Sequence, residues 1–494
     1  MNQQNEVQAR IVRQLGCALK DSNSNIRFLA LEGLQFFPGS KECELIAPLL
    51  QDSDRFVKWK AIQVAGGLKL DSARPSLVLN LENPDLNTRA FSALAIGVIG
   101  NPNDLKHLSV SFEREISPRV RQAIVRTLPH FSQTPPWDLL ARASRDGDVG
   151  VRIDAAKVIG CFAPNSAACD ILVNLLEKEN NGNVFATAIL GLGEFKQPIL
   201  IGYLQHSLLH SESRIRANAI EALGKFEFHQ VREIVFPFLK DPSNRVQANV
   251  ISIFFQAGHG NEVPKHLRKL LDSGNRWERA SGSWIAGKFR LFETVERLIE
   301  LLHDDEAVVT DRAAWALGEI KSPKTFGALV NSYFKASPWA LSNIIKAISC
   351  TATISDIPVL LSLFKQEQDP ALKAKFINIF SSLKAAQVKG EINSLKNDPD
   401  HRIRFSSFRY LGTVNPLENM DALFSGLSDS NQRVRAICAS LMLEGGDFRA
   451  LKALSNLLTD QEKMEKVQLI NTLRDFAEIS RFSSFLFSAK KGTL

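Results

Sequence analysis

The feature that most constrains the fold of this chain is a short phrase that recurs with a period of about 31 residues. It reads RIDAAKVIGCF at residues 152–162, RANAIEALGKF at 216–226 and DRAAWALGEI at 311–320. We mark each repeat at one fixed position at the start of this phrase, directly after an apolar residue. Arg152, for example, follows Val151. The fifteen marks, which are almost evenly spaced, are Arg27, Lys58, Arg89, Arg121, Arg152, Phe185, Arg216, Gln247, Glu278, Thr310, Ala340, Lys373, Arg404, Arg435 and Lys466. A period of this length indicates a solenoid of helix pairs.

Other columns of the same register support one amphipathic helix per repeat. Seven residues after the mark, all fifteen positions are apolar, and one residue before it thirteen are apolar. Three residues after the mark, ten of the fifteen are Ala, Ser or Cys. Positions −1, +3 and +7 share one face of a helix, and a small residue in the middle lets a neighbouring helix approach closely. The columns therefore predict the core face of each repeat.

Glycine and aspartate recur at fixed places around this helix. Position +8 holds Gly66, Gly97, Gly160, Gly193, Gly224, Gly318 and Gly412. We expect these glycines to end the helix, since glycine adopts positive φ at low cost. Aspartate recurs six residues before the mark, as at Asp52, Asp241 and Asp429. We expect it to end one helix and to cap the next.

This layout, D-x(5)-R-x-x-A-x-x-A-L-G, resembles HEAT-like repeats, and in particular the short form named after phycobilisome lyases. The resemblance covers nearly the whole chain from Asp21. It implies an all-α fold, an α-solenoid of about fifteen antiparallel helix pairs stacked into a right-handed superhelix with a concave inner surface. The expected domains are an N-terminal capping helix (1–20), the repeat array (21–475, with a divergent section at about 180–345) and a C-terminal Phe-rich helix and tail (476–494).

Composition narrows the classes of protein that fit. The hydrophobic fraction of 45% and the charged fraction of 23% are ordinary for a folded chain. No apolar run reaches the length that crosses a bilayer, and the first residues lack the apolar centre of a signal peptide. The six cysteines include no C-x-x-C pair. We therefore expect a cytoplasmic protein without disulfides and without a cofactor.

The marks themselves form a column of cations that admits two interpretations. Ten of the fifteen marks are Arg or Lys, and such a row could follow a phosphate backbone. The turn aspartates recur with the same period, so each cation has an acid in its own or the adjacent repeat, which favours a structural ladder of ion pairs. From Phe185 to Ala340 only one of six marks is basic. This change signals either a specialised surface or relaxed repeats.

The divergent section contains a basic segment at residues 265–290. Its seven cations face only two acidic residues in the sequence, and we list them as candidate contacts for a partner or an anion: Lys265, Arg268, Lys269, Arg276, Arg279, Lys288 and Arg290. Trp277 and Trp284 lie among them, and aromatic rings beside cations suit stacking of nucleic-acid bases. Because Trp277 falls in the −1 column and Trp284 lies near the same helical face, we expect both rings to be packed in the core.

The C-terminal segment is rich in phenylalanine. It is either a last helix packed on the preceding repeat or an exposed face that docks a partner, a second copy or a membrane surface. The candidate docking residues are Phe482, Phe485, Phe487, Lys490 and Lys491, and the two lysines would favour anionic headgroups.

Motifs that carry chemistry are missing from the sequence. There is no H-E-x-x-H, Walker loop or G-x-S-x-G, and no histidine is followed by glutamate. We therefore predict a non-enzymatic scaffold or adaptor that assembles one or more partner proteins on an elongated helical-repeat surface. The alternatives are nucleic-acid binding through the basic segment and an accessory role like that of the bilin lyases.

Overall fold

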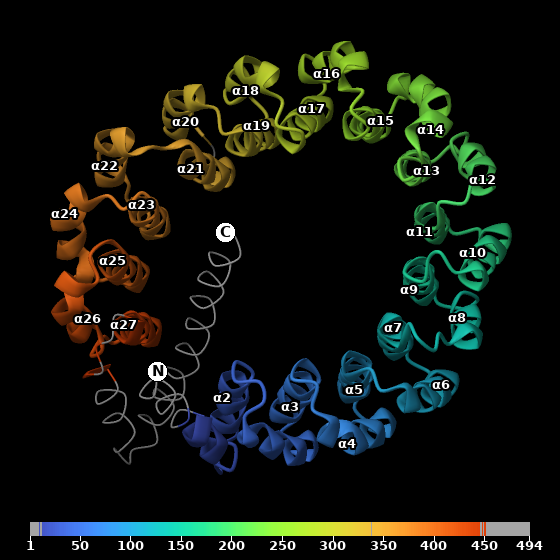
Figure 1. The fold of residues 1–494 in the computed structure, drawn as a ribbon, viewed down its shortest axis with the longest axis horizontal. Coiled ribbons are helices and arrows are strands. Elements are labelled where there is room, and N and C mark those ends of the chain that lie inside the picture. The colour runs from blue at the N-terminus through green and yellow to red at the C-terminus, as the bar shows by residue number, and fades with distance from the viewer. Residues whose placement is uncertain (1–8, 10–11, 337, 445–446, 448, 451–494) are drawn as a thin grey trace, which may run out of the picture. The chain divides into compact units, whose positions relative to one another are not determined.

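The structure is a computed structural model that describes residues 9, 12–336, 338–444, 447 and 449–450. Contacts within the chain divide it into two units. Unit 2 is Ile116–Ala352, and unit 1 contains the segments up to Glu115 and from Thr353 onward. Every regular element among the described residues is a helix (Figure 1). The predicted all-α solenoid of helix pairs is thereby confirmed.

The helices of each repeat form two rows, and the first row carries the marks. In unit 2 the first row consists of α7 (Pro118–Thr127), α9 (Val149–Gly160), α11 (Gly182–Leu192), α13 (Ser213–Leu223), α15 (Asn244–Gln256), α17 (Arg276–Lys288), α19 (Ala307–Ile320) and α21 (Pro338–Thr351). Its second row consists of α8 (Trp137–Ala143), α10 (Ser166–Lys178), α12 (Leu200–Ser207), α14 (Phe228–Val235), α16 (Pro264–Leu271), α18 (Val295–Leu301) and α20 (Phe326–Tyr333). Figure 1 shows the first row on the concave side of unit 2.

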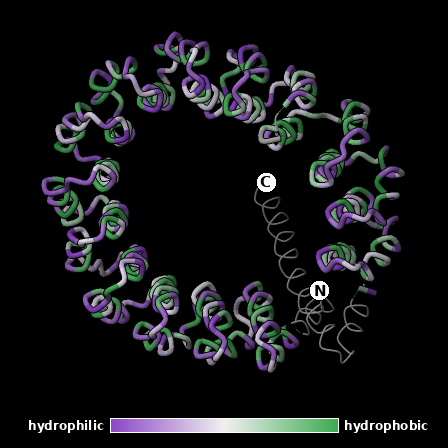
Figure 2. The backbone as a smooth tube through the Cα atoms, turned by 180° about the vertical axis from the view of Figure 1, so that it is seen from behind, coloured by the Kyte–Doolittle hydropathy of each residue, from purple (hydrophilic) through white to green (hydrophobic). Residues whose placement is uncertain are grey.

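Unit 1 repeats this arrangement. Its first row consists of α2 (Ser24–Leu34), α3 (Arg55–Gly67), α5 (Leu86–Ile99), α23 (Pro370–Ser382), α25 (His401–Val414) and α27 (Gln432–Glu444). Its second row consists of the 3₁₀ helix η1 (Lys41–Gln51), α4 (Arg74–Leu79), α6 (Leu105–Arg114), α22 (Ile357–Gln366), α24 (Lys389–Ser394) and α26 (Met420–Gly426). Residues 12–18 are also helical. Figure 2 shows hydrophilic and hydrophobic residues interspersed within the helices, as amphipathic packing requires.

The start of each first-row helix corrects the sequence register at two repeats. In twelve of the fourteen described first-row helices, the helix begins three residues before the mark assigned from the sequence. The helix α17 fits the same rule if its mark is Arg279 instead of Glu278. By the same rule the mark of α21 is Leu341 instead of Ala340, since α21 begins at Pro338. The sequence misled because Trp277 imitates the apolar residue that precedes a mark. The divergent section therefore contains two basic marks, Arg216 and Arg279.

The +7 column forms the centre of the stack. With the corrected register it is fully buried in all fourteen described repeats, from Leu34 to Met442. First-row helices pack on one another in sequence, as α17 packs on α19 and α19 on α21, and each second-row helix covers its own repeat. Each repeat therefore buries its apolar face only against its neighbours, which is the packing expected of a solenoid.

An ion-pair ladder joins successive repeats. The Arg216 guanidinium donates Nε to Asp241 Oδ2 and Nη2 to Asp241 Oδ1, both at 2.8 Å, and its Nη1 donates to the carbonyl of His210 at 2.9 Å. The acid belongs to the turn that leads to the next repeat in all seven such pairs: Arg27–Asp52, Arg89–Glu115, Arg121–Asp146, Arg152–Glu179, Arg216–Asp241, Arg279–Asp304 and Arg404–Asp429. The predicted structural ladder is confirmed at these repeats.

The ladder carboxylates are charged groups held in partly buried surroundings. Burial by itself would raise the pKa of Asp304, but the ion pair with Arg279 and the N–H of Glu306 outweigh it, so the pKa lies below its ordinary value. The turn acids also accept a backbone N–H two residues later, as Asp52 accepts from Asp54 at 2.8 Å. Asp54, not Asp52, then caps α3. The expectation that the turn aspartate caps the next helix is therefore wrong by two residues.

The divergent section replaces the ladder with other contacts at the same positions. Phe185 stacks on His210, which occupies the place of the ladder acid, with ring centroids 6.0 Å apart. Gln247 makes the same hydrogen bond to a carbonyl that a ladder arginine makes, because its Nε2 donates to the Asp241 carbonyl at 2.7 Å. Thr310 keeps the same bond to the Asp304 carbonyl at 3.2 Å. The repeats in this section are still stacked in register, although the ion pair is absent from these three marks.

The +8 glycines do not end their helices through positive φ, contrary to the sequence expectation. Gly193 and Gly224 have φ of −61° and −62°. A Cβ added at Gly66, Gly193 or Gly318 would come within 2.9, 2.7 and 3.0 Å of the Cα of an alanine in the next first-row helix. These glycines are therefore required for the close approach of adjacent first-row helices.

Positive φ occurs instead at position +11 of seven described repeats. It is found at Gly100 and Gly258, and also at five cationic residues: Lys69, Lys196, Arg290, Lys321 and Lys384. A cation at the C-terminal end of a helix is stabilised by the negative end of the helix dipole. The turn between the two helices of a repeat thus accepts a long cationic side chain where glycine is the more common residue.

We expect replacement of a ladder arginine to destabilise its repeat strongly. Arg216→Ala leaves the nearly buried Asp241 carboxylate without its partner, which should lower the free energy of unfolding by about 3 kcal/mol or more. Arg216→Gln should cost less, because glutamine can keep the carbonyl bond as Gln247 does. Hydrogen exchange in α13 and chemical denaturation measure both effects. A control, Arg402→Ala, removes an exposed pair and should change stability by less than about 1 kcal/mol.

Gly66 and Gly67 provide a matched pair that tests the close helix contact. Gly66→Ala places a Cβ 2.9 Å from the backbone of Ala95 and should lower the free energy of unfolding by about 1 to 3 kcal/mol. Gly67→Ala meets nothing within 4 Å and should be neutral or stabilising by up to about 1 kcal/mol. Thermal melting of the two variants decides between them. An equal change in stability in the two variants would mean that the contact with α5 does not govern the effect at Gly66.

Candidate binding surface

One stripe of each first-row helix takes no part in the core columns. We call positions −2, +2, +5 and +9 the variable stripe, because they share a helical face that lies away from the +7 column. In the repeat of α13 the stripe is Arg214, the buried Asn218, Glu221 and Lys225, the last of which follows the helix, and in α17 it is Trp277, Ser281, Trp284 and Lys288. The stripe thus displays different side chains in different repeats, whereas the core columns are nearly uniform.

The variable stripes of α9, α11, α13 and α15 line a groove of about 820 Å³. Its floor contains Gly160 and Gly191, and a Cβ at Gly160 would lie 3.3 Å from the Cα of Gly191. Leu190 and Ala163 supply apolar surface. The charged residues of the lining are Lys157, Glu194, Lys196, Arg214, Glu221 and Arg245. A volume of this size lies within the range of ligand sites in proteins.

Asparagines hold two arginines at the groove. Arg214 Nη1 donates to Asn183 Oδ1, and Arg245 Nη2 donates to Asn218 Oδ1 at 3.0 Å. Asn218 is itself fixed, because its Nδ2 donates to the Ala186 carbonyl at 2.8 Å. Each guanidinium is therefore oriented by an amide from the preceding repeat.

Both acids of the groove, Glu194 and Glu221, lie near cations outside its lining. Lys225 pairs with Glu194 at 2.5 Å. Burial lowers the pKa of Lys288, and the charge of Glu221 partly offsets this. Burial, followed by the charge of Glu194, raises the pKa of the Cys161 thiol. A thiol with a raised pKa is a poor nucleophile, so Cys161 lines the groove without being activated.

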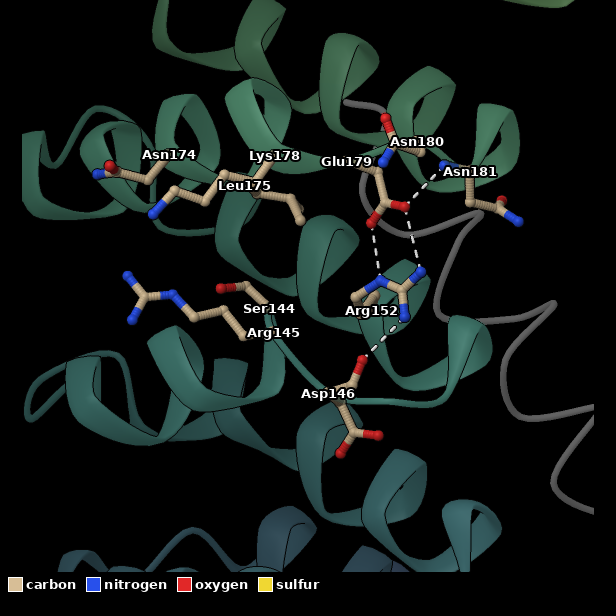
Figure 3. A pocket seen from close by; sticks show the side chains of 10 residues that line it. All are labelled: Ser144, Arg145, Asp146, Arg152, Asn174, Leu175, Lys178, Glu179, Asn180 and Asn181. Atoms are coloured by element: carbon tan, nitrogen blue, oxygen red, sulfur yellow. Dashed lines mark hydrogen bonds and ion pairs between the residues drawn. The ribbon is translucent and has the colours of Figure 1, made fainter.

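A second pocket, of about 630 Å³, lies beside the ladder pair of α9 (Figure 3). Arg152 crosses its wall, bonded to Glu179 and to the carbonyl of Asp146. Arg145 and Lys178 extend from the other side of the pocket. This pocket is therefore bounded on one side by an ion pair of the repeat stack.

The structure separates the seven cations of the basic segment. Lys265, Arg268 and Lys269 lie on the second-row helix α16, whereas the other four belong to the first-row helix α17 and its end. Arg279 is a ladder residue bonded to Asp304 at 2.6 Å. Arg276 pairs with Glu306 at 3.0 Å, and Arg268 approaches Asp272 at 3.6 Å.

The structure contradicts the prediction that Trp277 is packed in the core. Its side chain is 52% exposed, because it lies in the −2 column of the corrected register and not in the −1 column. The Arg276 guanidinium lies 5.1 Å from the centroid of its ring. Trp284 is half-buried in the +5 column, with Lys288 Nζ 4.7 Å from its centroid. Both rings therefore belong to the variable stripe.

Sequence reasoning missed an aromatic cluster on the first row of unit 1. Trp59 contacts Phe56 and Phe91, with centroids 5.4 and 5.9 Å apart. Its indole N–H donates to Asp85 at 2.9 Å. The spacing of these aromatics by about one period was visible in the sequence. It missed Arg214 and Arg245 too, although they lie one period apart.

The candidate docking residues Phe482, Phe485, Phe487, Lys490 and Lys491 lie outside the described residues. Among the residues that are described, no three His, Cys, Asp or Glu side chains gather as a metal site. Within the same part of the chain, no helix combines the length and the hydropathy that a membrane span needs.

Comparison with known proteins agrees with this architecture. The family model of HEAT repeats matches residues 44–129 and 295–380. A crystal structure of importin beta is similar over 98% of this chain and 80% of its own, with a TM-score of 0.50 and 12% identity. The Kap95:Nup1 complex is similar over 96% of this chain and 78% of the other, with a TM-score of 0.53 and 12% identity.

At this identity the structural likeness extends to the fold alone. No curated protein sequence matches the chain. The match to HEAT repeats does not single out the form named after phycobilisome lyases, which stays a prediction. The family match, the paired helices and the repeating core columns agree with one another. The chain is therefore an α-solenoid, and its residues 44–129 and 295–380 match the family model of HEAT repeats.

Proposed function

We propose that this chain is a non-enzymatic scaffold that binds partner proteins along the variable stripe of its first-row helices. The observation that carries this proposal is that some columns of each repeat hold the stack together, whereas the variable stripe is not one of them. The +7 column, the ladder and the +8 glycines hold the stack together. The variable stripe lies outside these columns, yet it displays oriented arginines and exposed aromatic rings.

Two further points support protein binding. Aromatic and arginine side chains are the residues that dominate protein interfaces, and the stripe of unit 2 contains both. The structurally similar Kap95 is described in complex with another protein, Nup1. A first row that continues through many repeats offers a partner many such contacts at once.

Nucleic-acid binding through the basic segment has weaker support. Its cations are divided between two rows of helices, and three of them face an acid. A polynucleotide needs a continuous row of cations that are free to contact phosphates. We therefore retain nucleic acid as an outcome of the experiment below and not as a second proposal.

Site-specific photo-crosslinking in an extract of the native cells tests the scaffold proposal. A photoreactive phenylalanine at Gln256, at position +9 of α15, should form a discrete adduct with a protein that mass spectrometry identifies. The same residue at Tyr203, exposed on the second-row helix α12, is the matched control and should not form it. The absence of a protein adduct at Gln256, or an adduct removed by nuclease, would overturn the proposal.

The Phe-rich end remains a second proposed docking surface, with a test of its own. We expect a chain truncated after Arg474 to capture less of the partner, while the Gln256 adduct still forms. Circular dichroism should show that the remaining repeats stay helical. If the truncated chain captures the partner as well as the full chain does, residues 476–494 are not a docking surface.

A further inference from the structure

Arg214 and Arg245 are the only stripe arginines of the groove described above, and they occupy the same place in adjacent repeats. Both are at position −2, and both side chains are exposed. Each is held by an asparagine of the repeat before it, Asn183 or Asn218. Asn218 is 5% exposed and bonded to the Ala186 carbonyl, so the anchor of Arg245 is buried and fixed. The Arg245 guanidinium is therefore oriented before any partner arrives, and Arg214 bonds in the same way to the exposed Asn183.

The charge of these two arginines is not neutralised within the described part of the chain. The ladder arginines bond to carboxylates in every one of the seven pairs, whereas Arg214 and Arg245 bond to neutral amide oxygens. Arg402 makes the contrast sharper. It also occupies position −2, in α25, but it pairs with its own N-cap Asp400 at 2.8 Å. A fixed guanidinium without a carboxylate is a ready site for an external one.

The rest of the groove favours an acidic occupant with some apolar character. Lys157 and Lys196 add positive charge to the lining. Of its two acids, Glu194 is paired with Lys225, and Glu221 interacts with Lys288. Leu190 supplies an apolar contact. The lining of the groove therefore carries a net positive charge.

The spacing of the row fits an extended peptide. Packed helices lie about 8 to 10 Å apart, and an extended chain in the polyproline II conformation has three residues per turn and advances about 3.1 Å per residue. Side chains three residues apart in such a peptide can therefore meet stripe residues of adjacent repeats. The next member of the −2 column after Arg245 is Trp277, which is exposed and linked to α15 because Asn244 donates to its carbonyl at 3.1 Å.

We propose that the −2 column of α13, α15 and α17 binds an extended acidic segment of a partner protein. Two carboxylates of that segment contact Arg214 and Arg245, and an apolar side chain lies on Trp277. This inference rests on the proposed scaffold function and names the chemistry of its partner. Each ladder arginine already bonds to a carboxylate of this chain. Arg214 and Arg245 do not, and the partner's carboxylates would take that place.

A polynucleotide fits this surface less well. Stable binding to phosphates takes several cations in a continuous row, and this column offers two. Glu194 and Glu221 would lie close to the phosphates and repel them. A peptide avoids this conflict, since its charges are confined to particular side chains.

Fluorescence anisotropy with the full-length protein tests the proposal. The probes are short fluorescein-labelled peptides with two Glu three residues apart and a Leu three residues beyond, made in both chain directions. The controls are the same peptides with Gln or Lys in place of Glu, and oligodeoxythymidine. We expect one of the acidic peptides to bind, and the Gln peptide to bind at least about tenfold more weakly.

Variants then locate the binding. Arg214→Gln with Arg245→Gln should weaken the acidic peptide at least about tenfold, whereas Arg402→Gln, a matched loss of charge at position −2, should leave it unchanged. Trp277→Ala should also weaken it. Arg214→Glu with Arg245→Glu should bind the Lys peptide in place of the Glu peptide, a gain that misfolding cannot produce.

Three results would overturn the inference. They are failure of both acidic peptides to bind, an equal loss in Arg402→Gln, and binding of oligodeoxythymidine in preference to the peptides. If the peptides fail while the Gln256 adduct with a protein still forms, the scaffold function stands and only the acidic partner is wrong. If the adduct is also missing, the scaffold function fails with it.

Discussion

The stack depends on a guanidinium group that bonds in two directions at once. Each ladder arginine uses one edge for the carboxylate of the next repeat and another nitrogen for a carbonyl of its own turn, as Arg216 does with Asp241 and His210. Because both bonds come from one planar group, the angle and the distance between successive turns are fixed together. A lysine, with a single nitrogen on a flexible stem, would fix neither as well.

Close packing between adjacent first-row helices adds a second constraint to that of the ion-pair ladder. The ladder lies at the start of the first-row helices, and the +8 glycines lie near their ends, so adjacent helices are held at both ends. The first row packs more closely than the second, and in unit 2 the first row lies on the concave side (Figure 1). The +8 glycines of the first row allow this close approach.

Because the ion-pair ladder and the close helix contacts hold the repeats together, most residues of the variable stripe are not needed for stacking. That is why the stripe can differ from repeat to repeat while the repeats still stack. In unit 2 it carries arginines held by amides and a tryptophan that is half exposed, whereas the first row of unit 1 carries an aromatic cluster around Trp59. The divergent marks show the same tolerance, because Phe185 with His210 replaces an ion pair by a ring contact of similar reach.

The sequence by itself determined the period, the core columns and a ladder of ion pairs at the basic marks, because these depend on contacts that successive repeats make in the same way. The structure decided that the acid of each described ladder pair belongs to the following turn and not to the arginine's own. The sequence placed Trp277 in the core because an apolar residue before a charged one imitates the repeat phrase. It assigned the +8 glycines to helix ends because a sequence does not display the distance between two helices. Only the tertiary structure decided which side chains face outward together, since Arg214, Arg245 and Trp277 become neighbours through the stacking of separate repeats.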